Sequence, residues 1–273
     1  MAVGHDVPGR ITRLPGGVAL NVAMALKRAG SGAQLLSSVG RDVEGDQLIA
    51  ACDALGLGTG YIHRSLDLPT DQYMAVEAEN GLVAAIADAH SLEKAGDSIL
   101  EPMRDGRLGS LDAPFKGAIV LDGNLTEALL AVIARDPVFS QADLRVAPAS
   151  PGKVRRLLPL LPHPRLTLYI NRIEAGLLLE RKFPDALRAA QALHETGVAQ
   201  AVVTDGGDAT ALVGHGRVLT AMPPSIVVER VTGAGDTFLA SHVSAERVGL
   251  AAEDALVDAL NVTAAYVSGQ TPV

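Results

Sequence analysis

The feature that most constrains the fold of this 273-residue chain is the alternation of short β-rich runs with Ala/Leu-rich runs. Apolar residues in the Ala/Leu-rich runs recur at three- and four-residue spacing, which is typical of amphipathic helices. Strands separated by helices imply βαβ units and a mostly parallel sheet covered on both faces. We therefore expect a single α/β domain over residues 1–273. The clearest predicted strands are AQLLSSVG from Ala33, GAIVLDGN from Gly117, LTLYIN from Leu166 and QAVVTDGG from Gln200.

Glycines mark the ends of three predicted helices. Gly30, Gly56 and Gly197 each follow an apolar-periodic run, at the position where a left-handed residue commonly closes a helix. Ligands of parallel sheets bind where the carboxyl ends of strands meet the N-termini of helices. Polar residues at those junctions are therefore the first candidates for a site.

One segment interrupts the alternation. TDQYMAVEAENGLVAAIADAH, from Thr70, predicts two strands joined at Asn80-Gly81, a strong short-range hairpin signal. With the polar residues 61–67 it indicates a small antiparallel flap, and we place this lid segment at about residues 60–90, with part of residues 1–15. An edge hairpin without a role is the simple alternative. A lid is the better interpretation if a cleft needs to exclude water.

Composition excludes several classes of function. Hydrophobic residues make up 48% and charged residues 20% of the chain, which disfavours disorder. The formal net charge of -8 disfavours nucleic acid as a partner, and the short basic pair Arg155-Arg156 is expected to lie on a solvated helix face. Cys52 is the lone cysteine, and neither a signal peptide nor an apolar run of membrane-spanning length is evident. We expect a cytoplasmic protein that binds neither nucleic acid nor membrane.

The stretch RVTGAGDTFLASH, which begins at Arg230, places a Gly-Ala-Gly turn before one aspartate and an apolar, helix-like run. One interpretation is that Asp236 caps or lightly charges the start of a helix. The other is that the turn lets backbone N–H groups close around an anion, with Asp236 beside it to take a proton. The stretch alone favours neither. The turn consists of Gly233, Ala234 and Gly235.

Three further stretches place polar residues at strand ends or helix starts. PGGVALNVAMAL puts a glycine pair ahead of Asn21, which allows close backbone approach and adds an amide donor and acceptor. SSVGRDVEGDQL has a strand-end glycine, then Asp42 and Gly45 before another helix. NRIEAGLLL presents Asn171 and Glu174 three apart on one helical face, an oxygen pair that suits Mg²⁺ with water and phosphate. A capped helix start with a first-turn glutamate is the alternative.

Motifs of other chemistries are missing from the sequence. There is no GxxxxGK[ST] phosphate loop and no GxSxG elbow, and GAGDTF lacks the third glycine of a dinucleotide fingerprint. The seven histidines show no paired metal-ligand spacing. We expect His242 to be a packed helix residue and Asp205 to be a solvated residue at the end of a strand.

In chain order the motifs are GG…N, VGxDxxG, NxxE, TDGG and GAGD, and together they resemble the ribokinase (phosphofructokinase-B-type) family of sugar and nucleoside kinases. The resemblance extends from about Pro15 to Gly269. Within the family it is closest to pseudouridine kinases, on the stretches PGRITRLPGGVALNVA, LPTDQYMAVEAENGLVAAIADA, VLDGNLTEALL and INRIEAGLL. It implies a ribokinase-like α/β fold with a mostly parallel central sheet, helices on both faces and a small antiparallel β lid.

The resemblance also implies a role for each matching residue. Asp236 would take the proton from a primary hydroxyl of the sugar, and the N–H groups of the Gly-Ala-Gly turn would surround the transferring γ-phosphoryl group. ATP and Mg²⁺ would be required. The remaining implied roles are sugar-hydroxyl binding by Gly17 and Asn21, substrate contact by Asn124, Mg²⁺ binding through water and phosphate by Asn171 and Glu174, contact with the ATP phosphates by Thr204 and Gly206, and a place beside the adenine for the helix around Asn261.

The chain departs from the family pattern in three ways. Relatives normally open with a strand whose aspartate binds sugar hydroxyls, but this chain reaches its glycine pair without one, and Asp6 is not given that role. It also stops at QTPV, short of the final helix usual in the family, so we expect truncation at both ends and weakened activity. Arg230 stands where many relatives carry an acidic residue near a monovalent-cation site, so we do not expect activation by K⁺.

The sequence therefore predicts ATP-dependent phosphorylation of a primary hydroxyl on a ribose-containing small molecule, with pseudouridine as first choice. A ribokinase- or adenosine-kinase-like activity on another sugar or nucleoside is the alternative enzyme. A non-catalytic ligand-binding relative is the alternative from another class, although an intact GAGD and NxxE would be superfluous in a pure binder. The resemblance further implies a homodimer formed through the lid.

Overall fold

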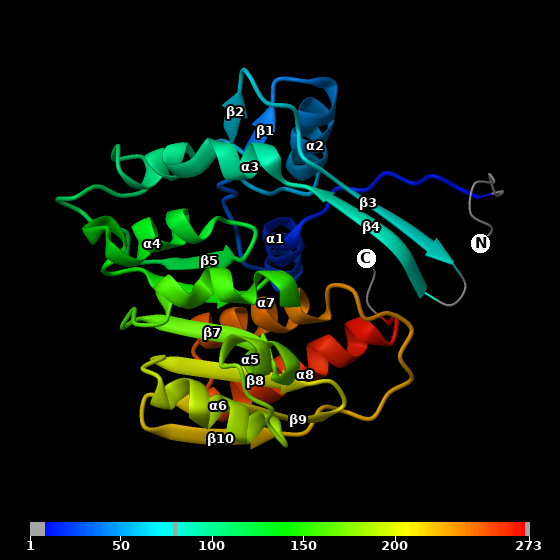
Figure 1. The fold of residues 1–273 in the computed structure, drawn as a ribbon, viewed down its shortest axis with the longest axis vertical. Helices are drawn as coiled ribbons and strands as arrows, with labels where there is room; N and C mark the ends of the chain where they lie inside the picture. The colour runs from blue at the N-terminus through cyan, green and yellow to red at the C-terminus, as the bar shows by residue number, and fades with distance from the viewer. Residues whose placement is uncertain (1–8, 79–80, 271–273) are drawn as a thin grey trace.

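The computed structural model describes residues 9–78 and 81–270 (Figure 1). Its strands are β1 (Ser38–Gly40), β2 (His63–Ser65), β3 (Gln72–Ala78), β4 (Gly81–Asp88), β5 (Ala118–Asp122), β6 (Asp143–Ala147), β7 (Leu166–Asn171), β8 (Gln200–Asp205), β9 (Asp208–Gly214) and β10 (Arg217–Ala221). Its α-helices are α1 (Val18–Arg28), α2 (Val43–Ala54), α3 (His90–Ala95), α4 (Glu127–Arg135), α5 (Arg172–Leu178), α6 (Ala186–Glu195), α7 (Ala234–Arg247) and α8 (Ala252–Val267). Three 3₁₀ segments are η1 (Gly96–Met103), η2 (Pro137–Phe139) and η3 (Pro151–Leu160).

The central sheet has six strands in the order β10-β9-β8-β7-β6-β5. Strands β5 to β8 are parallel, as predicted, whereas β9 and β10 add an antiparallel hairpin that the sequence analysis did not predict. The register pairs Asn171 with Thr204, so the last residue of β7 lies beside the end of β8. The polar residues that follow these parallel strands therefore lie together at the carboxyl ends of the strands.

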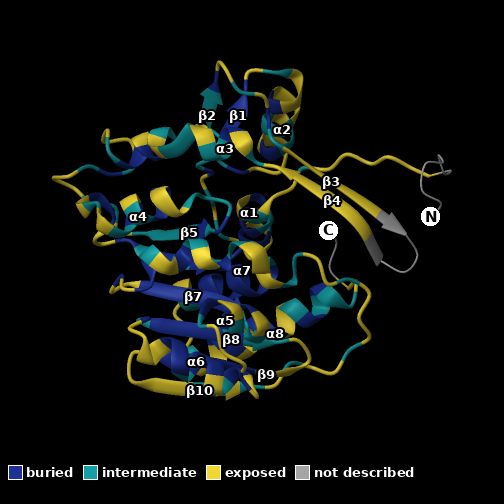
Figure 2. Cartoon of the chain, in the orientation of Figure 1, coloured by how far each residue is buried: buried dark blue, intermediate teal, exposed yellow. Residues whose placement is uncertain are grey.

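Strand alternation divides the core into two layers, because successive side chains of a strand point to opposite faces. On β7, Leu168 and Ile170 belong to the core beneath α4, α5, α6 and η3, whereas Tyr169 belongs to the core beneath α1, α7 and α8. On β8, Val202 and Val203 divide in the same way. Helices therefore cover both faces, as predicted, and Figure 2 shows β7 and β8 buried between them.

The predicted flap is present as β3 and β4, which pair antiparallel with a register shift between Val76 and Glu77. Asn80 of the predicted turn lies outside the described residues. In Figure 1 the two strands project sideways from the body of the molecule. The predicted strand from Ala33 is much shorter than expected, because only Ser38–Gly40 pairs with β2, preceded by a single bridge from Gln34 to Gly58.

The VGxDxxG motif builds the base of this flap. The Asp42 carboxylate accepts hydrogen bonds from Gly45 N at 2.8 Å, from Thr70 N at 2.7 Å and from Thr70 Oγ1 at 2.5 Å. A Cβ at Gly40 or Gly45 would overlap these partners. Directly before β3, the Asp71 carboxylate accepts hydrogen bonds from Ser91 N and Leu92 N of α3, each at 2.9 Å. The motif therefore joins the base of the flap to α2, and Asp71 joins it to α3.

Other predictions about local structure are confirmed. Gly30, Gly56 and Gly197 follow the C-caps of α1, α2 and α6 and adopt positive φ. Cys52 is buried and unbridged. Within the part of the chain that the structure describes, no helix is both long enough and apolar enough to span a membrane.

Candidate active site

The site is centred on the first turn of α7. Gly233 is the N-cap residue and adopts the left-handed conformation with φ 82, which a side chain would disfavour. A Cβ at Gly233 would also lie 2.7 Å from the Tyr266 hydroxyl. The N–H groups of a first helical turn have no intrahelical acceptor, and the helix dipole makes this end positive. The structure therefore places Gly233, Ala234 and Gly235 at the start of α7, and their binding of an anion stays a prediction.

Asp236 is held in place by a hydrogen bond from α1. Asn21 Nδ2 donates to Asp236 Oδ2 at 2.9 Å, and Asn21 N donates to Gly17 O at 2.9 Å. Burial raises the pKa of the Asp236 carboxyl, the Asn21 hydrogen bond lowers it, and the neighbouring charge of Asp122 raises it. Asp236 is half-buried, while Gly17 and Gly235 are exposed. The carboxyl group is therefore partly buried beside an exposed glycine turn.

The loop after β5 adds residues that the sequence analysis missed. Asp122, the last residue of β5, accepts a hydrogen bond from Asn124 N at 2.6 Å. Lys153 Nζ donates to Asn124 Oδ1 at 2.6 Å. The predicted substrate contact Asn124 thus lies between a carboxylate and an ammonium group. Asp122 could have been found as a carboxylate at a strand end, directly before Gly-Asn.

The glycine-rich loop is tied to the C-terminus of α8. Glu229 N and Arg230 N donate to Val267 O at 3.0 and 3.1 Å. Arg230 Nε donates to Tyr266 O at 2.6 Å, and its guanidinium lies 4.1 Å from the centre of the Tyr266 ring. The Tyr266 hydroxyl donates to Thr232 O at 3.0 Å. Tyr266 therefore holds the backbone immediately before Gly233, a role that no motif revealed.

The predicted metal ligands form a capping box. Asn171 Oδ1 accepts from Glu174 N at 2.8 Å, and Glu174 Oε2 accepts from Asn171 N at 3.0 Å. Burial raises the pKa of Glu174, although the Asn171 hydrogen bond opposes this. Among residues 9–78 and 81–270, no group of three or more His, Cys, Asp and Glu side chains is arranged to hold a metal ion. One carboxylate with an amide still fits Mg²⁺, which commonly retains water and phosphate oxygens in its shell.

Two of the predicted nucleotide contacts, Thr204 and Gly206, lie at the end of β8, and the third lies on α8. Thr204 is the register neighbour of Asn171, and Gly206, with φ 60, is exposed in the turn from β8 to β9. Asn261 is exposed on α8. The expectation for Asp205 was wrong: its side chain is only 14% exposed and pairs with Arg172 Nε at 2.6 Å. The ion pair secures this turn at the end of β8.

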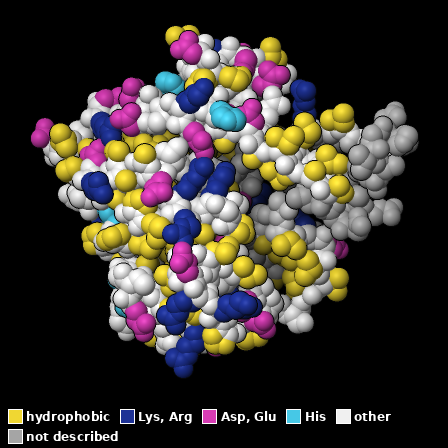
Figure 3. Space-filling view, viewed as in Figure 1, with side chains coloured by type: hydrophobic (Ala, Val, Ile, Leu, Met, Phe, Trp, Pro, Cys, Tyr) yellow, Lys and Arg dark blue, Asp and Glu magenta, His cyan; other side chains and the backbone are white. Residues whose placement is uncertain are grey.

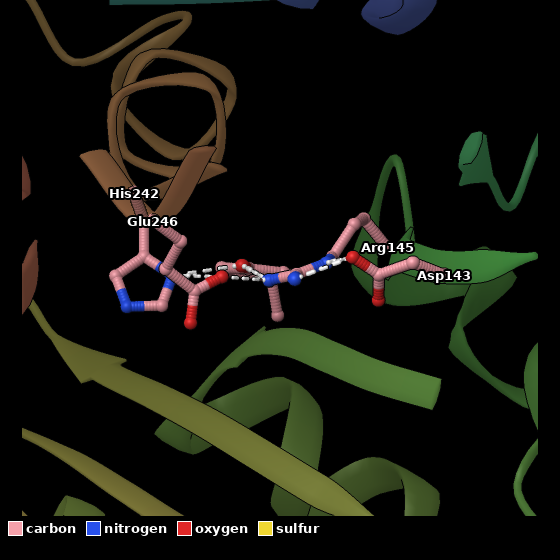
Figure 4. Close-up of polar contacts among 5 residues, drawn as sticks. Asp143, Arg145, His242 and Glu246 are labelled. Atoms are coloured by element: carbon pink, nitrogen blue, oxygen red, sulfur yellow. Dashed lines mark hydrogen bonds and ion pairs between the residues drawn. The ribbon is translucent and has the colours of Figure 1, made fainter. Parts of the chain in front are cut away.

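The other half of α7 is fixed to the sheet by a buried polar network, which Figure 4 shows from Asp143 across to His242. His242 Nδ1 and the Tyr169 hydroxyl are 2.8 Å apart, and Arg145 Nη1 donates to that hydroxyl at 3.0 Å. Arg145 also pairs with Glu246 and, at 2.6 Å, with Asp143. Burial lowers the pKa of His242, which is fully buried, so the prediction of a packed helix residue is confirmed.

The chain is similar to known carbohydrate kinases. The model of the pfkB family of carbohydrate kinases matches residues 2–271. The chain belongs to this family. It is 31% identical over 250 residues to a pseudouridine kinase of Escherichia coli (strain K12), a match that covers 87% of this chain and 74% of the relative.

Solved structures of the family share the fold. A carbohydrate kinase from Agrobacterium tumefaciens superposes with a TM-score of 0.81 at 25% identity, over 100% of this chain and 87% of the other. An Arabidopsis thaliana ribokinase complexed with ribose and ATP superposes with a TM-score of 0.75 at 21% identity, over 94% and 82% of the two chains. The predicted ribokinase-like α/β fold is confirmed.

Proposed function

We propose that the protein catalyses ATP-dependent phosphorylation of a primary hydroxyl on a ribose-containing small molecule, with pseudouridine as the first choice. The observation that carries the proposal is the Asp236 carboxyl group, which Asn21 holds in the first turn of α7, after the left-handed N-cap Gly233. Phosphoryl transfer needs positioning and charge stabilisation more than covalent chemistry, and this arrangement supplies both.

Each element of the site has a defined task in this proposal. Asp236 accepts the proton of the sugar hydroxyl, a contribution of about 10²–10⁴ in rate for a positioned base. The N–H groups of the Gly233–Gly235 turn face the developing negative charge, where each donor contributes about 2.7–4 kcal/mol by analogy with an acyl-transfer oxyanion hole. Asn171 and Glu174 would hold Mg²⁺, which would neutralise phosphate charge. Thr204, Gly206 and the helix around Asn261 would hold ATP.

The choice of substrate rests on two supports. The relative with 31% identity is described as a pseudouridine kinase, although that identity supports the substrate class more strongly than the individual compound. At the site, Asn21, Asp122 and Asn124 offer amide and carboxylate groups to sugar hydroxyls, beside the exposed backbone of Gly17. A ribokinase- or adenosine-kinase-like activity on another sugar or nucleoside is the alternative.

A substrate panel tests the proposal. Turnover with ATP and Mg²⁺ is measured for pseudouridine, uridine, adenosine, ribose and fructose, with pseudouridine expected to give the highest kcat/KM. Asp236→Asn should lose turnover while it still binds nucleotide. No turnover with any compound, together with thermal stabilisation by a sugar or nucleoside, would favour a non-catalytic binding protein. Unchanged turnover in Asp236→Asn would remove this carboxyl group from the mechanism.

We also propose that the flap forms a homodimer. Large apolar side chains are exposed on β3 and β4, and Figure 3 shows hydrophobic atoms gathered over these strands. The register places Met74 opposite Ile86, and Val76 lies on the same face, so this face is apolar. A two-stranded ribbon is marginal without a partner. Light scattering should give twice the chain mass, and Ile86→Glu should give the monomer mass.

A further inference from the structure

Lys153 contacts the candidate site although no sequence motif includes it. It lies near the start of η3, where the chain leaves the carboxyl end of β6, and it is half-buried. Its ammonium group is 2.6 Å from Asn124 Oδ1. Its Cβ is so close to the loop after β5 that a Cβ added at Gly123 would lie 3.3 Å from it. This lysine therefore packs against the loop that follows β5.

The contact determines which way the Asn124 amide points. An ammonium group can only donate hydrogen bonds, so the amide atom that faces Lys153 must be the oxygen. The NH₂ group of Asn124 is consequently turned away from Lys153, and the Asn124 side chain stabilises the ionised form of Asp122. Burial raises the pKa of Asp122, and hydrogen bonds from the Asn124 backbone and side chain, followed by the charge of Lys153, lower it. Lys153 thus supports both the amide orientation and the ionised carboxylate.

A second cation holds the same loop in a different way. Arg156 Nη1 donates to the backbone carbonyl oxygen of Asn124 at 3.2 Å and pairs with Glu93 at 2.8 Å. Arg156 therefore fixes the main chain of the loop, whereas Lys153 fixes the side chain of Asn124. Removal of the Lys153 charge should leave the loop in place and release only the amide.

We propose that Lys153 is a positioning residue that sets sugar selectivity by fixing the Asn124 amide as a donor beside the Asp122 acceptor. This inference rests on the proposed function. A neighbouring donor and acceptor complement a vicinal diol, in which one hydroxyl donates to Asp122 and the other accepts from Asn124. The chemical class selected is a furanose with both ring hydroxyls, in preference to a deoxyribose.

Three single variants test this inference. Lys153→Met removes the donor and keeps the apolar stem, Lys153→Arg keeps a donor and a charge, and Arg155→Met removes a neighbouring exposed cation of η3 as a matched control. KM and kcat are measured for the best ribo-substrate of the panel and for its 2′-deoxy and 3′-deoxy analogues. KM for ATP and the melting temperature Tm are measured alongside.

Lys153→Met should raise KM for the ribo-substrate about tenfold, which corresponds to about 1.4 kcal/mol. It should also reduce the preference over at least one deoxy analogue by a similar factor, because the lost contact belongs to a hydroxyl. KM for ATP and Tm should stay unchanged. Lys153→Arg should restore most of the selectivity, and Arg155→Met should behave as the wild type.

A double-mutant cycle shows whether Lys153 acts through Asn124. The variant Lys153→Met/Asn124→Ala should be no worse than Asn124→Ala alone, because the lysine then has no amide to orient. Fully additive losses in KM would overturn the inference, as would an unchanged deoxy preference in Lys153→Met. Failure of the proposed function is separate, because it would appear as a wild-type protein that phosphorylates no member of the panel.

Discussion

The ionisation of Asp236 can be shifted in opposite directions by changes at two neighbours. Asn21 stabilises the charged carboxylate through its 2.9 Å hydrogen bond, whereas the charge of Asp122 destabilises it. Asn21→Leu keeps a side chain of similar size without the donor, and it should raise the pKa of Asp236 further. Asp122→Asn removes the repulsive charge and should lower that pKa. Because Asp236 is the proposed base, both shifts should appear in the pH dependence of activity.

The magnitude follows from the strength of the lost contact. A hydrogen bond to a charged group contributes about 1.5–3 kcal/mol, and each 1.36 kcal/mol is a factor of ten. On the acidic limb, where the rate follows the ionised fraction of Asp236, Asn21→Leu should therefore lower kcat/KM about 10- to 150-fold. Part of this loss is independent of pH, because Asn21 is also a proposed sugar contact. The position of the acidic limb therefore reports on Asp236 more directly than the height of the plateau.

The assay is kcat/KM from pH 5 to 9 with coupled detection of ADP. A base must be ionised, so activity should fall as pH drops through the raised pKa of Asp236. The acidic limb should move to higher pH in Asn21→Leu and to lower pH in Asp122→Asn. Limbs that coincide with the wild type in both variants, or that move in the reverse order, would refute the assignment of Asp236 as the base.

Four further expectations follow from the contacts described. Burial raises the pKa of Asp236 in the folded protein, so its ionisation destabilises the fold as pH rises above the unfolded pKa of about 3.9. Asp236→Asn should therefore have a higher Tm than the wild type at pH 8 and the same Tm at pH 3. Tyr266→Phe loses the bond to Thr232 O and should lower kcat about 2- to 12-fold with little change in sugar KM, if a neutral hydrogen bond contributes about 0.5–1.5 kcal/mol. Glu174→Gln keeps a residue able to form the capping box, so its Tm should be unchanged while the Mg²⁺ concentration for half-maximal rate rises. Because Arg230 already places a positive charge against α8, initial rates in K⁺ and Na⁺ buffers should be equal.

The sequence was sufficient to predict the layered fold because its signals are local. Alternating runs and glycine caps located β5, β7 and β8, and Asn80-Gly81 located the flap. The sequence did not predict β6, β9 and β10, because these segments form strands only by pairing with neighbouring strands. The predicted strand from Ala33 failed for the same reason, because a two-stranded sheet gives most of that segment no partner.

The candidate site shows the same division between local and long-range information. Asp236 and Asn21 stood in motifs, but their mutual hydrogen bond spans 215 residues and could not be read from spacing. Lys153 and Tyr266 had no local signal at all, because their roles come from contacts between elements far apart in the chain. Asp42 stood in a motif, yet it belongs to the base of the flap and its contacts are structural.

The arrangement of α7 suggests why a buried polar network persists in an otherwise apolar core. Apolar side chains tolerate small sliding of a helix along a sheet, whereas hydrogen bonds with fixed geometry specify one register. His242 and Glu246 bind Tyr169 and Arg145 of the sheet, while Asn21 holds Asp236 at the other end of the helix. The buried Nε2 of His242 has no hydrogen-bond partner in the described part of the chain, so the network carries an energetic cost. Such a cost is reasonable where a carboxylate must be placed to a fraction of an ångström, since small misplacement is expensive in rate.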